Sequence, residues 1–388
     1  MTLHDLSHYG LSGDRGYLSH AEIDDIELPD DFAEVEGAAA MLSGLLTTGR
    51  VRHWLNGLGM PDIEAFLASA SEEEIGVAMV RYSFLVQAYV WGEPTPPAFL
   101  PANLAIPLVA LSDHVGFPPV MNYAGYVLDN WYRLDKEAPV ALDNIVMDQN
   151  FAGGQDENWF VLVHVAIEAT AGRALELGVD LVRASDAGDA GKVEALLIEM
   201  NTVWDAINAI FDRMVEKCDP YVYYNRVRPY IHGWKNNPAM PEGLIYEGVA
   251  KFGGKPQPVR GQTGSQSSIV PAMDGLFQVS HTNDELREFL ADLHQYRPRR
   301  HRAFIEDMQA ASHLRDFARE QGQGLKNAFN ACVEQVARFR SRHLEYAAAY
   351  INKQASSGAG NDPDVGTGGT PFMKYLKKHR DENRAQTI

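Results

Sequence analysis

The sequence predicts an all-α protein, on two observations. Apolar residues recur at steps of three and four through most of the chain, which is the spacing of one helical face. No sustained alternation of apolar and polar residues, the pattern of a half-buried strand, appears in the first half. In chain order, the expected helices cover residues 32–58, 63–70, 72–89, 105–114, 119–132, 159–177, 190–218, 269–279, 283–294, 298–311, 313–321, 325–352 and 371–384.

Local signals mark where several of these helices begin or cannot form. Leu28-Pro29-Asp30-Asp31 has the form of an N-terminal cap for the first helix. Ser71, followed by three glutamates, caps the helix that runs to about Tyr89. Residues 92–107 contain five prolines in sixteen positions, which excludes a regular helix there.

A connection at residues 133–158 separates two helical regions. It reads LDKEAPVALDNIVMDQNFAGGQDEN and ends in a Gly-Gly pair and an acidic turn. We place a domain boundary near Asn150, giving a small helical domain at residues 1–150 and a larger one at residues 151–388.

Composition limits the class of protein. With 388 residues, 45% of them hydrophobic and 22% charged, the chain reads as soluble and globular. Its net charge of −18 argues against nucleic acid or an anionic membrane as a partner. The two cysteines, Cys218 and Cys332, form no disulfide framework, and neither a secretory signal nor an apolar run of about 18 residues occurs. We therefore expect a cytoplasmic protein.

The apolar stripe of residues 325–352 carries an exception. His343 lies inside it, flanked on the apolar face by aromatic residues, and Arg338, Arg340 and Arg342 crowd the preceding turn. A buried imidazole needs a partner for its nitrogens. Spacing alone leaves two explanations, a core histidine bonded to a carbonyl or carboxylate, or a metal ligand. The first is the more common.

Several blocks of sequence, taken together, carry a family resemblance. RFRSRHLEYAAAY, followed by GTGGT at residues 366–370, resembles the proximal haem helix and substrate loop of indoleamine 2,3-dioxygenases. Further blocks follow the order of that family over roughly residues 85–375. These are AYVWGEPTPPAFLPANLAIP, PPVMNYAGYVLDNW, RPYIHGWKNNP, GLIYEG, GQTGSQSS and YRPRRHRAFI. The resemblance implies a small helical domain packed on a larger one that holds haem b.

The resemblance assigns the proximal side of the haem. His343 matches the axial ligand of the iron, with its other ring nitrogen held by an acceptor at the position of Asp274. Arg340 matches an arginine beside a haem propionate, where a fork of donors suits a carboxylate. A solvated or capping carboxylate is the alternative for Asp274, and a solvated helix charge for Arg340.

The distal side is assigned to the helix that follows Trp159. Phe160 and His164 are four residues apart and share a face. Phe160 matches an aromatic that packs on the substrate indole. Animal-type members have a small hydroxyl residue at the position of His164, whereas tryptophan 2,3-dioxygenases have a histidine. His164 would accept a hydrogen bond from the indole N–H, coordinate iron without substrate, or be a structural core histidine.

Further pocket residues come from four other segments. Tyr223 and Arg228 match an aromatic and an arginine beside the haem. Arg228 precedes Pro229, which biases its backbone towards extended geometry, and its guanidinium would pair with a substrate carboxylate. Tyr223 replaces a phenylalanine of the animal enzymes and makes the pocket more polar. The remaining matches are Tyr123 and Tyr126 from the small domain, Gly264 above the haem, and Thr367 of the GTGGT loop.

The implied activity is insertion of both atoms of O2 across the indole C2–C3 bond of L-tryptophan or a related indoleamine, with an external electron donor for ferric iron. Two alternatives remain: an enzyme that oxygenates or rearranges a modified indole in secondary metabolism, and a haem-based gas or redox sensor. Other chemistries lack their motifs, since HExxH, GxSxG and GxGxxG are absent. His164 and Glu168 have i,i+4 spacing, but a non-haem iron site needs two histidines and a carboxylate.

Overall fold

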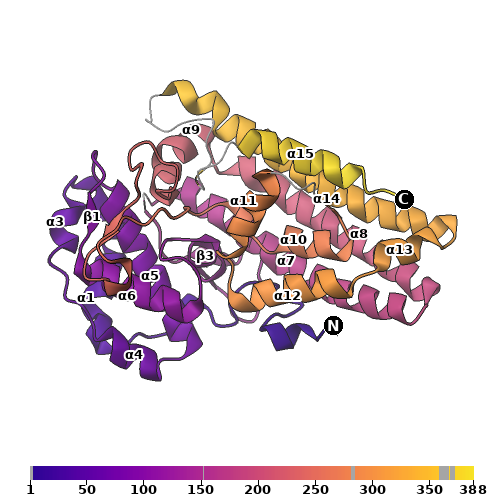
Figure 1. The fold of residues 1–388 in the computed structure, drawn as a ribbon, viewed down its shortest axis with the longest axis horizontal. Helices are drawn as coiled ribbons and strands as arrows, with labels where there is room; N and C mark the ends of the chain where they lie inside the picture. Colours follow the sequence, from indigo (N-terminus) through magenta and orange to yellow (C-terminus); the bar gives the residue numbers. More distant parts are fainter. Residues whose placement is uncertain (1–2, 152, 281–284, 358–366, 368–371) are drawn as a thin grey trace.

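A computed structural model describes residues 3–151, 153–280, 285–357, 367 and 372–388. Helices dominate this part of the chain, and its strands have only two or three residues each (Figure 1). The all-α prediction is confirmed. Among the described helices, none is both long and apolar enough to cross a membrane.

The N-terminal helices gather at one end of the molecule, around the buried helix α5, Glu72–Trp91 (Figure 1). The prediction of a single helix at residues 32–58 is wrong. Three helices form there instead, and Gly49, with φ +64°, separates the second from the third. The helix α5 packs on α1 (Ala33–Ala40), α2 (Leu42–Thr47), α3 (Val51–Leu55) and α6 (Ala102–Val115), while η3 (Asp30–Phe32) packs on α1 and α4 (Ile63–Ser69) packs on α6.

The start of α5 confirms the capping prediction. The Ser71 hydroxyl accepts from the Glu74 N–H at 3.1 Å, and the Ser71 N–H donates to the Glu74 carboxylate at 2.7 Å. The exclusion of helix up to Pro107 is wrong, because α6 begins at Ala102 and contains that proline. Leu104 and Leu108 are fully buried around it, and this packing offsets the lost hydrogen bond.

The helix expected at residues 119–132 is also wrong. Only a π-helical turn forms, η4 (Ala124–Leu128), preceded by Tyr123. The Asn122 side chain accepts from the Gly125 N–H at 3.1 Å and so competes with a longer helix. After the turn, β2 (Trp131–Arg133) pairs antiparallel with β3 (Ile145–Met147), while β1 (Phe99–Leu100) pairs in parallel with β4 (Ile245–Tyr246).

Four long helices form the other part of the molecule. The helix α7 (Gln155–Asp186) packs on α8 (Ala190–Asp212), which packs on α14 (Gln323–Tyr350), and α15 (Phe372–Arg384) covers α14 (Figure 1). The helices α10 (Ile269–Leu276), α11 (Glu285–His294), α12 (Arg299–Ala311) and α13 (Leu314–Arg319) complete this part. Both cysteines are buried, and burial raises the pKa of each thiol.

Short turns join these helices. They are η1 (Leu6–Tyr9), η2 (Ile23–Asp25), η5 (Arg213–Glu216), α9 (Pro220–Val222), η6 (Tyr223–Val227), η7 (Arg228–Ile231), η8 (Ala250–Phe252), η9 (Gly264–Gln266) and η10 (Asn352–Ser357). Three of them, η5, η6 and η9, contribute side chains to the cavity described next.

Candidate active site

A cavity of about 880 Å³ lies between α7, α8, α10 and α14, with residues 262–267 along one side. Most residues that the sequence assigned to a site line it. They are Tyr123, Phe160, His164, Tyr223, Gly264, Asp274, Arg340, His343 and Thr367. Tyr126 and Arg228 are not among the lining residues. Segments more than two hundred residues apart in the chain therefore meet at one site.

His343 faces this cavity from α14. Burial lowers the pKa of its imidazole to about 4, and the neighbouring His164 and Arg340 act in the same direction. The ring of Phe211, on α8, lies edge-on to the His343 ring at 6.4 Å. At neutral pH the His343 imidazole is therefore neutral, which is the form that ligates a metal.

Arg340 and Asp274 pair at the cavity wall. The Arg340 guanidinium donates two hydrogen bonds, of 3.1 and 2.6 Å, to the two carboxylate oxygens of Asp274 on α10. Arg340 is only 6% exposed. The role predicted for Asp274, acceptor for the second nitrogen of His343, stays a prediction. In the structure Asp274 contacts Arg340, which lies one turn before His343 on α14.

His164 faces the same cavity from α7. Its Nδ1 lies 2.7 Å from the Phe160 carbonyl oxygen. A carbonyl only accepts, so Nδ1 carries the proton and Nε2 keeps its lone pair. Burial lowers the pKa of His164, so this imidazole is also neutral at pH 7. Two neutral imidazoles, from different helices, thus share one cavity.

Aromatic rings form much of the wall. The rings of Phe160 and Tyr223 lie 4.7 Å apart, and Tyr350 meets Tyr223 edge-on at 5.7 Å. Phe211 stacks on Phe339 at 4.6 Å. The sequence did not single out Phe211, which reaches the cavity from the end of α8. Such surroundings are dry and suit a flat aromatic ligand.

The two tyrosines of the small N-terminal region differ in position. The Tyr123 hydroxyl donates to Glu168 at 2.9 Å, and its ring lies 6.1 Å from the His164 ring at a steep angle. Tyr126 is fully buried, and its hydroxyl donates to Glu157 at 3.4 Å. The structure therefore brings Tyr123 to the cavity and leaves Tyr126 in the core beside it.

Arg228 is fully buried and does not line the cavity. Its guanidinium lies over the Tyr224 ring, 5.4 Å from the centroid. The extended backbone expected before Pro229 is wrong, because Arg228 has φ −52° and ψ −39° between the π-helical turn η6 and the 3₁₀ turn η7. The hydrogen bonds of these consecutive turns override the preference of a residue before proline. The break in the helix at this point is as predicted.

Two glycines and Thr367 define another part of the wall. Gly233 and Gly261 cross so closely that a Cβ on either would lie 2.1 Å from the backbone nitrogen of the other. The Gly233 N–H donates to the Thr367 carbonyl at 3.3 Å, and the Thr367 hydroxyl donates to the Gln262 carbonyl at 2.5 Å. Thr367 is the one described residue of GTGGT, and the rest of that run lies outside the described residues.

Gly264 begins the turn η9 on the cavity wall. A Cβ there would meet no heavy atom within 4 Å. Space is therefore open at this position, and a larger side chain would reach into it.

Comparisons with known proteins show the family of this chain. A sequence model described as indoleamine 2,3-dioxygenase matches residues 5–386. The chain belongs to the indoleamine 2,3-dioxygenase family. It is 32% identical over 394 residues to human indoleamine 2,3-dioxygenase 2, with 97% of this chain and 94% of the relative covered. Family membership supports a haem-dependent dioxygenase.

Fungal members of the family are comparably similar. An indoleamine 2,3-dioxygenase of Aspergillus nanangensis is 30% identical over 397 residues, covering 97% of this chain and 96% of the relative. A 6-hydroxytryptophan 2,3-dioxygenase of Fusarium equiseti is 27% identical over 400 residues, with 97% and 96% covered. The family therefore includes proteins named for different indoles.

The cavity of this indoleamine 2,3-dioxygenase family member fits haem on three grounds. Its volume of about 880 Å³ is within the range of cofactor pockets. The neutral imidazole of His343 lies at its wall, where an iron ligand is needed. Arg340 adds a guanidinium on the same helix, three residues earlier, which suits a propionate.

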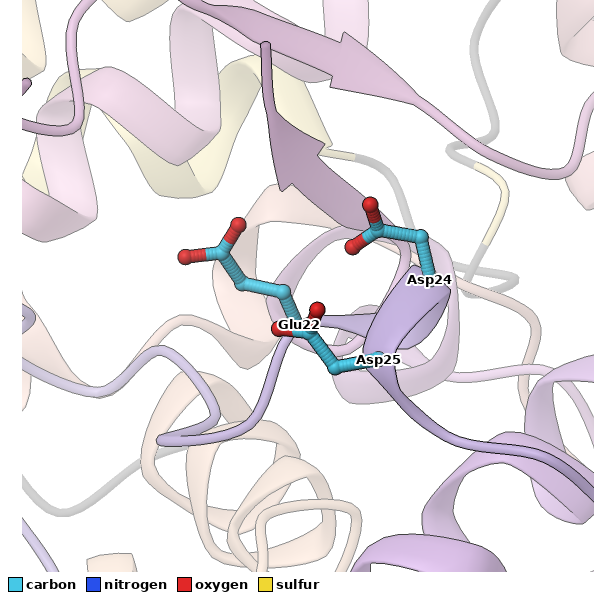
Figure 2. A group of neighbouring side chains, drawn as sticks. All are labelled: Glu22, Asp24 and Asp25. Carbon is cyan, nitrogen blue, oxygen red and sulfur yellow. The ribbon is translucent and has the colours of Figure 1, made fainter. Parts of the chain in front are cut away.

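A separate group of carboxylates lies outside the cavity and is paired with basic side chains. Figure 2 shows Glu22, Asp24 and Asp25, whose oxygens lie within 4.8 Å of one another. The Lys136 ammonium binds all three, at 2.9, 2.6 and 3.2 Å, and Arg133 binds Glu22 at 2.6 Å. These cations hold the pKa of Glu22 at about 2 despite its burial. The cluster therefore joins η2 to the segment after β2 through ion pairs.

Proposed function

We propose that this chain binds haem b through His343 and adds both atoms of O2 across the indole C2–C3 bond of L-tryptophan, giving N-formylkynurenine. One observation carries the proposal. In a chain of this family, two neutral imidazoles, His343 on α14 and His164 on α7, line a single cavity with aromatic walls.

The proximal side holds the cofactor. With haem bound, the neutral imidazole of His343 would ligate the iron, and the Arg340 guanidinium, oriented by Asp274, would bind a propionate. Bound haem supplies the iron and the oxygen chemistry. Both oxygen atoms end in the product, so turnover consumes no electrons. An external donor is needed only to reduce ferric iron before the first turnover.

The distal side orients the indole. With its proton on Nδ1, His164 presents the Nε2 lone pair to the cavity, where it accepts the indole N–H. Phe160 and Tyr223, whose rings lie 4.7 Å apart, together form one aromatic surface for the indole to pack on. His164 has a second candidate role, coordinating the iron while no substrate is bound. Substrate binding would then have to displace this bond.

The remaining groups select an amino acid and exclude water. Arg228 pairs with the substrate carboxylate, after a side-chain movement that brings the buried guanidinium to the cavity. Tyr123 and Gly264 shape the indole end, and Tyr126 supports this end from the core beside the cavity. Thr367 covers the cavity where it contacts Gln262 and Gly233. The main contribution of the protein is thus positioning in a dry pocket.

Product analysis tests the proposal. Purified protein is loaded with haem, reduced, and supplied with O2 and L-tryptophan. N-formylkynurenine should accumulate over many turnovers with both oxygen atoms derived from labelled O2. Haem binding without any product from tryptophan would refute the assigned reaction.

A second candidate is a dioxygenase for a modified indole. His164 and Tyr223 place polar groups in the pocket, and one similar protein is named a 6-hydroxytryptophan 2,3-dioxygenase. Ring-hydroxylated tryptophans in the same assay distinguish the two, through the ratio of kcat/KM values. A haem-based sensor would bind O2 or another gas reversibly and form no product from any indole.

A further inference from the structure

Glu168 lies one turn after His164 on α7 and has no exposed surface. Its Oε1 accepts two hydrogen bonds, from the Tyr123 hydroxyl at 2.9 Å and from the Ser267 hydroxyl at 2.9 Å. Tyr123 and Ser267 both line the cavity, whereas Glu168 is not among the lining residues. One carboxyl oxygen therefore joins two separate segments of the cavity wall to the helix that carries His164.

The N-terminal segment seals this carboxyl from solvent. A Cβ on Gly16 would lie 2.2 Å from the Glu168 carbonyl oxygen, and one on Gly172 would lie 2.5 Å from the Gly13 carbonyl oxygen. The segment thus rests directly on the backbone of α7 at this turn. The Glu168 carboxyl beside this contact has no exposed surface.

Burial of the Glu168 carboxyl costs folding stability, and this cost indicates a role beyond packing. Oε2 of Glu168 has no hydrogen-bond partner among the described residues. Burial raises the pKa of Glu168 to about 7, although its two hydrogen bonds lower it. A carboxyl kept in this state destabilises the fold relative to an apolar residue of similar size. Stability alone does not account for it.

Few charged or titratable groups surround Glu168. On its own helix the nearest is His164, one turn away. Tyr17 faces it from the N-terminal segment, with the His301 ring 4.7 Å from the Tyr17 ring. Arg297 is also close by, and it donates to the Ser267 carbonyl at 3.2 Å. The direct contacts of the carboxyl are nonetheless the two hydroxyls of the cavity wall.

We propose that Glu168 is a positioning residue of the substrate pocket. It holds the Tyr123 and Ser267 hydroxyls away from the substrate and thereby fixes the Tyr123 ring beside His164. The kinetic test of this inference rests on the proposed function, whereas the crystallographic test does not. Without the carboxyl, both hydroxyls lose their acceptor and turn towards the cavity, and the Tyr123 ring is free to shift.

Kinetics of two substitutions test the role. Glu168→Leu removes the acceptor and should raise KM for L-tryptophan about tenfold while kcat changes less. Glu168→Gln keeps an acceptor of the same shape and should rescue KM to within about twofold of the wild-type value. Asp129→Asn is the matched control, because burial also raises the pKa of this carboxyl, at the residue that follows η4. This substitution should leave KM unchanged.

A double-mutant cycle tests whether Glu168 affects KM through Tyr123. If Glu168 acts through Tyr123, the Glu168→Leu and Tyr123→Phe substitutions remove the same bond, and their effects on KM should not add. Additive effects, or equal KM values for Glu168→Leu and wild type, would overturn the proposal.

A crystallographic test is independent of the substrate. In haem-free crystals, Glu168→Leu should displace the Tyr123 and Ser267 hydroxyls, and Glu168→Gln should not. Unchanged positions of both hydroxyls in Glu168→Leu would refute the positioning role even if tryptophan proved not to be the substrate. A wild-type protein without tryptophan turnover, by contrast, would count against the proposed function and leave this structural result standing.

Discussion

Arg340 and Asp274 meet at the cavity wall through two parallel hydrogen bonds, and neither side chain is more than slightly exposed. Replacing Asp274 by Ala leaves a buried guanidinium without this carboxylate. We expect the haem-free protein to lose about 3 kcal/mol of unfolding free energy. Haem should restore part of this loss, because a propionate can take the place of the carboxylate. Urea unfolding with and without haem measures both effects.

A surface ion pair on the same helix is the control. Arg338 donates to Asp205 at 3.0 Å, with side chains 47% and 64% exposed. Asp205→Ala should cost less than about 1 kcal/mol, with or without haem. Equal losses for Asp274→Ala and Asp205→Ala would show that the Arg340 pair has no special role.

Replacing the two cavity histidines should separate their roles. His343→Ala should abolish stable haem binding, with loss of the normal Soret band, because no other imidazole on α14 replaces the ligand. His164→Ala should retain the haem and raise KM for tryptophan about tenfold, the effect of one lost hydrogen bond. Absorption spectra and steady-state kinetics measure these outcomes. A full, normal Soret band in His343→Ala would contradict the axial assignment.

Arg228→Ala should raise KM for L-tryptophan by roughly 10- to 100-fold, the range for one charge-assisted hydrogen bond. Tryptamine, which has no carboxylate, is the matched control substrate, and its KM should not change. Thermal unfolding checks that the buried substitution has not simply unfolded the protein. Equal increases for both substrates would remove the carboxylate role and assign Arg228 to the core.

The stability of the haem-free protein should depend on Glu168 and Asp129 between pH 5 and 7. Burial raises the pKa of each carboxyl to about 7, from 4.5 for Glu168 and 3.8 for Asp129. In this window the folded protein binds more protons than the unfolded chain, so the free energy of unfolding falls as the pH rises. Glu168→Gln should remove up to about 1.4 kcal/mol per pH unit of this dependence.

Buried histidines act in the opposite direction. The pKa of His343 is about 4 and that of His301 about 3, so both favour unfolding as the pH falls below 6.5. The informative quantity is therefore the difference between wild type and Glu168→Gln in urea unfolding at each pH. A difference that does not vary with pH would show that Glu168 is ionised throughout.

Gly172→Ala should destabilise the protein by about 2 kcal/mol, because the new methyl group meets the backbone of the N-terminal segment. Gly76→Ala is the matched control on α5, where a Cβ meets nothing within 4 Å. That substitution should stabilise the protein by about 0.5–1 kcal/mol. Urea unfolding compares the two. A stabilising Gly172→Ala would mean that the N-terminal segment moves away at little cost.

Helical periodicity in the sequence predicted the fold class, and the family resemblance supplied nine residues that line the cavity. The stripe containing His343 and the capping box at Ser71 each lie within one helix. Helix boundaries depended on more distant partners. Residues 119–132 form only one π-helical turn, partly because the Asn130 side chain bonds the backbone of Gln149 at 2.8 Å.

The parts of the site that sequence reasoning missed depend on tertiary contacts. Phe211 reaches the cavity only because the end of α8 packs on α14. Glu168 has spacing from His164 that first invited a comparison with metal sites. Its partners, Tyr123 and Ser267, lie 45 and 99 residues away in the chain, so no local pattern reveals them.

The crossing of Gly233 and Gly261 has a consequence for engineering. The position of this wall depends on two backbones in contact, which leave no room for a side chain at either glycine. Libraries that vary Phe160, Tyr223 or Gly264 should thus alter indole preference while the frame of the pocket persists. Positions 233 and 261 are best kept out of such libraries, since any residue larger than glycine would push the two segments apart and carry Gln262 and Thr367 with them.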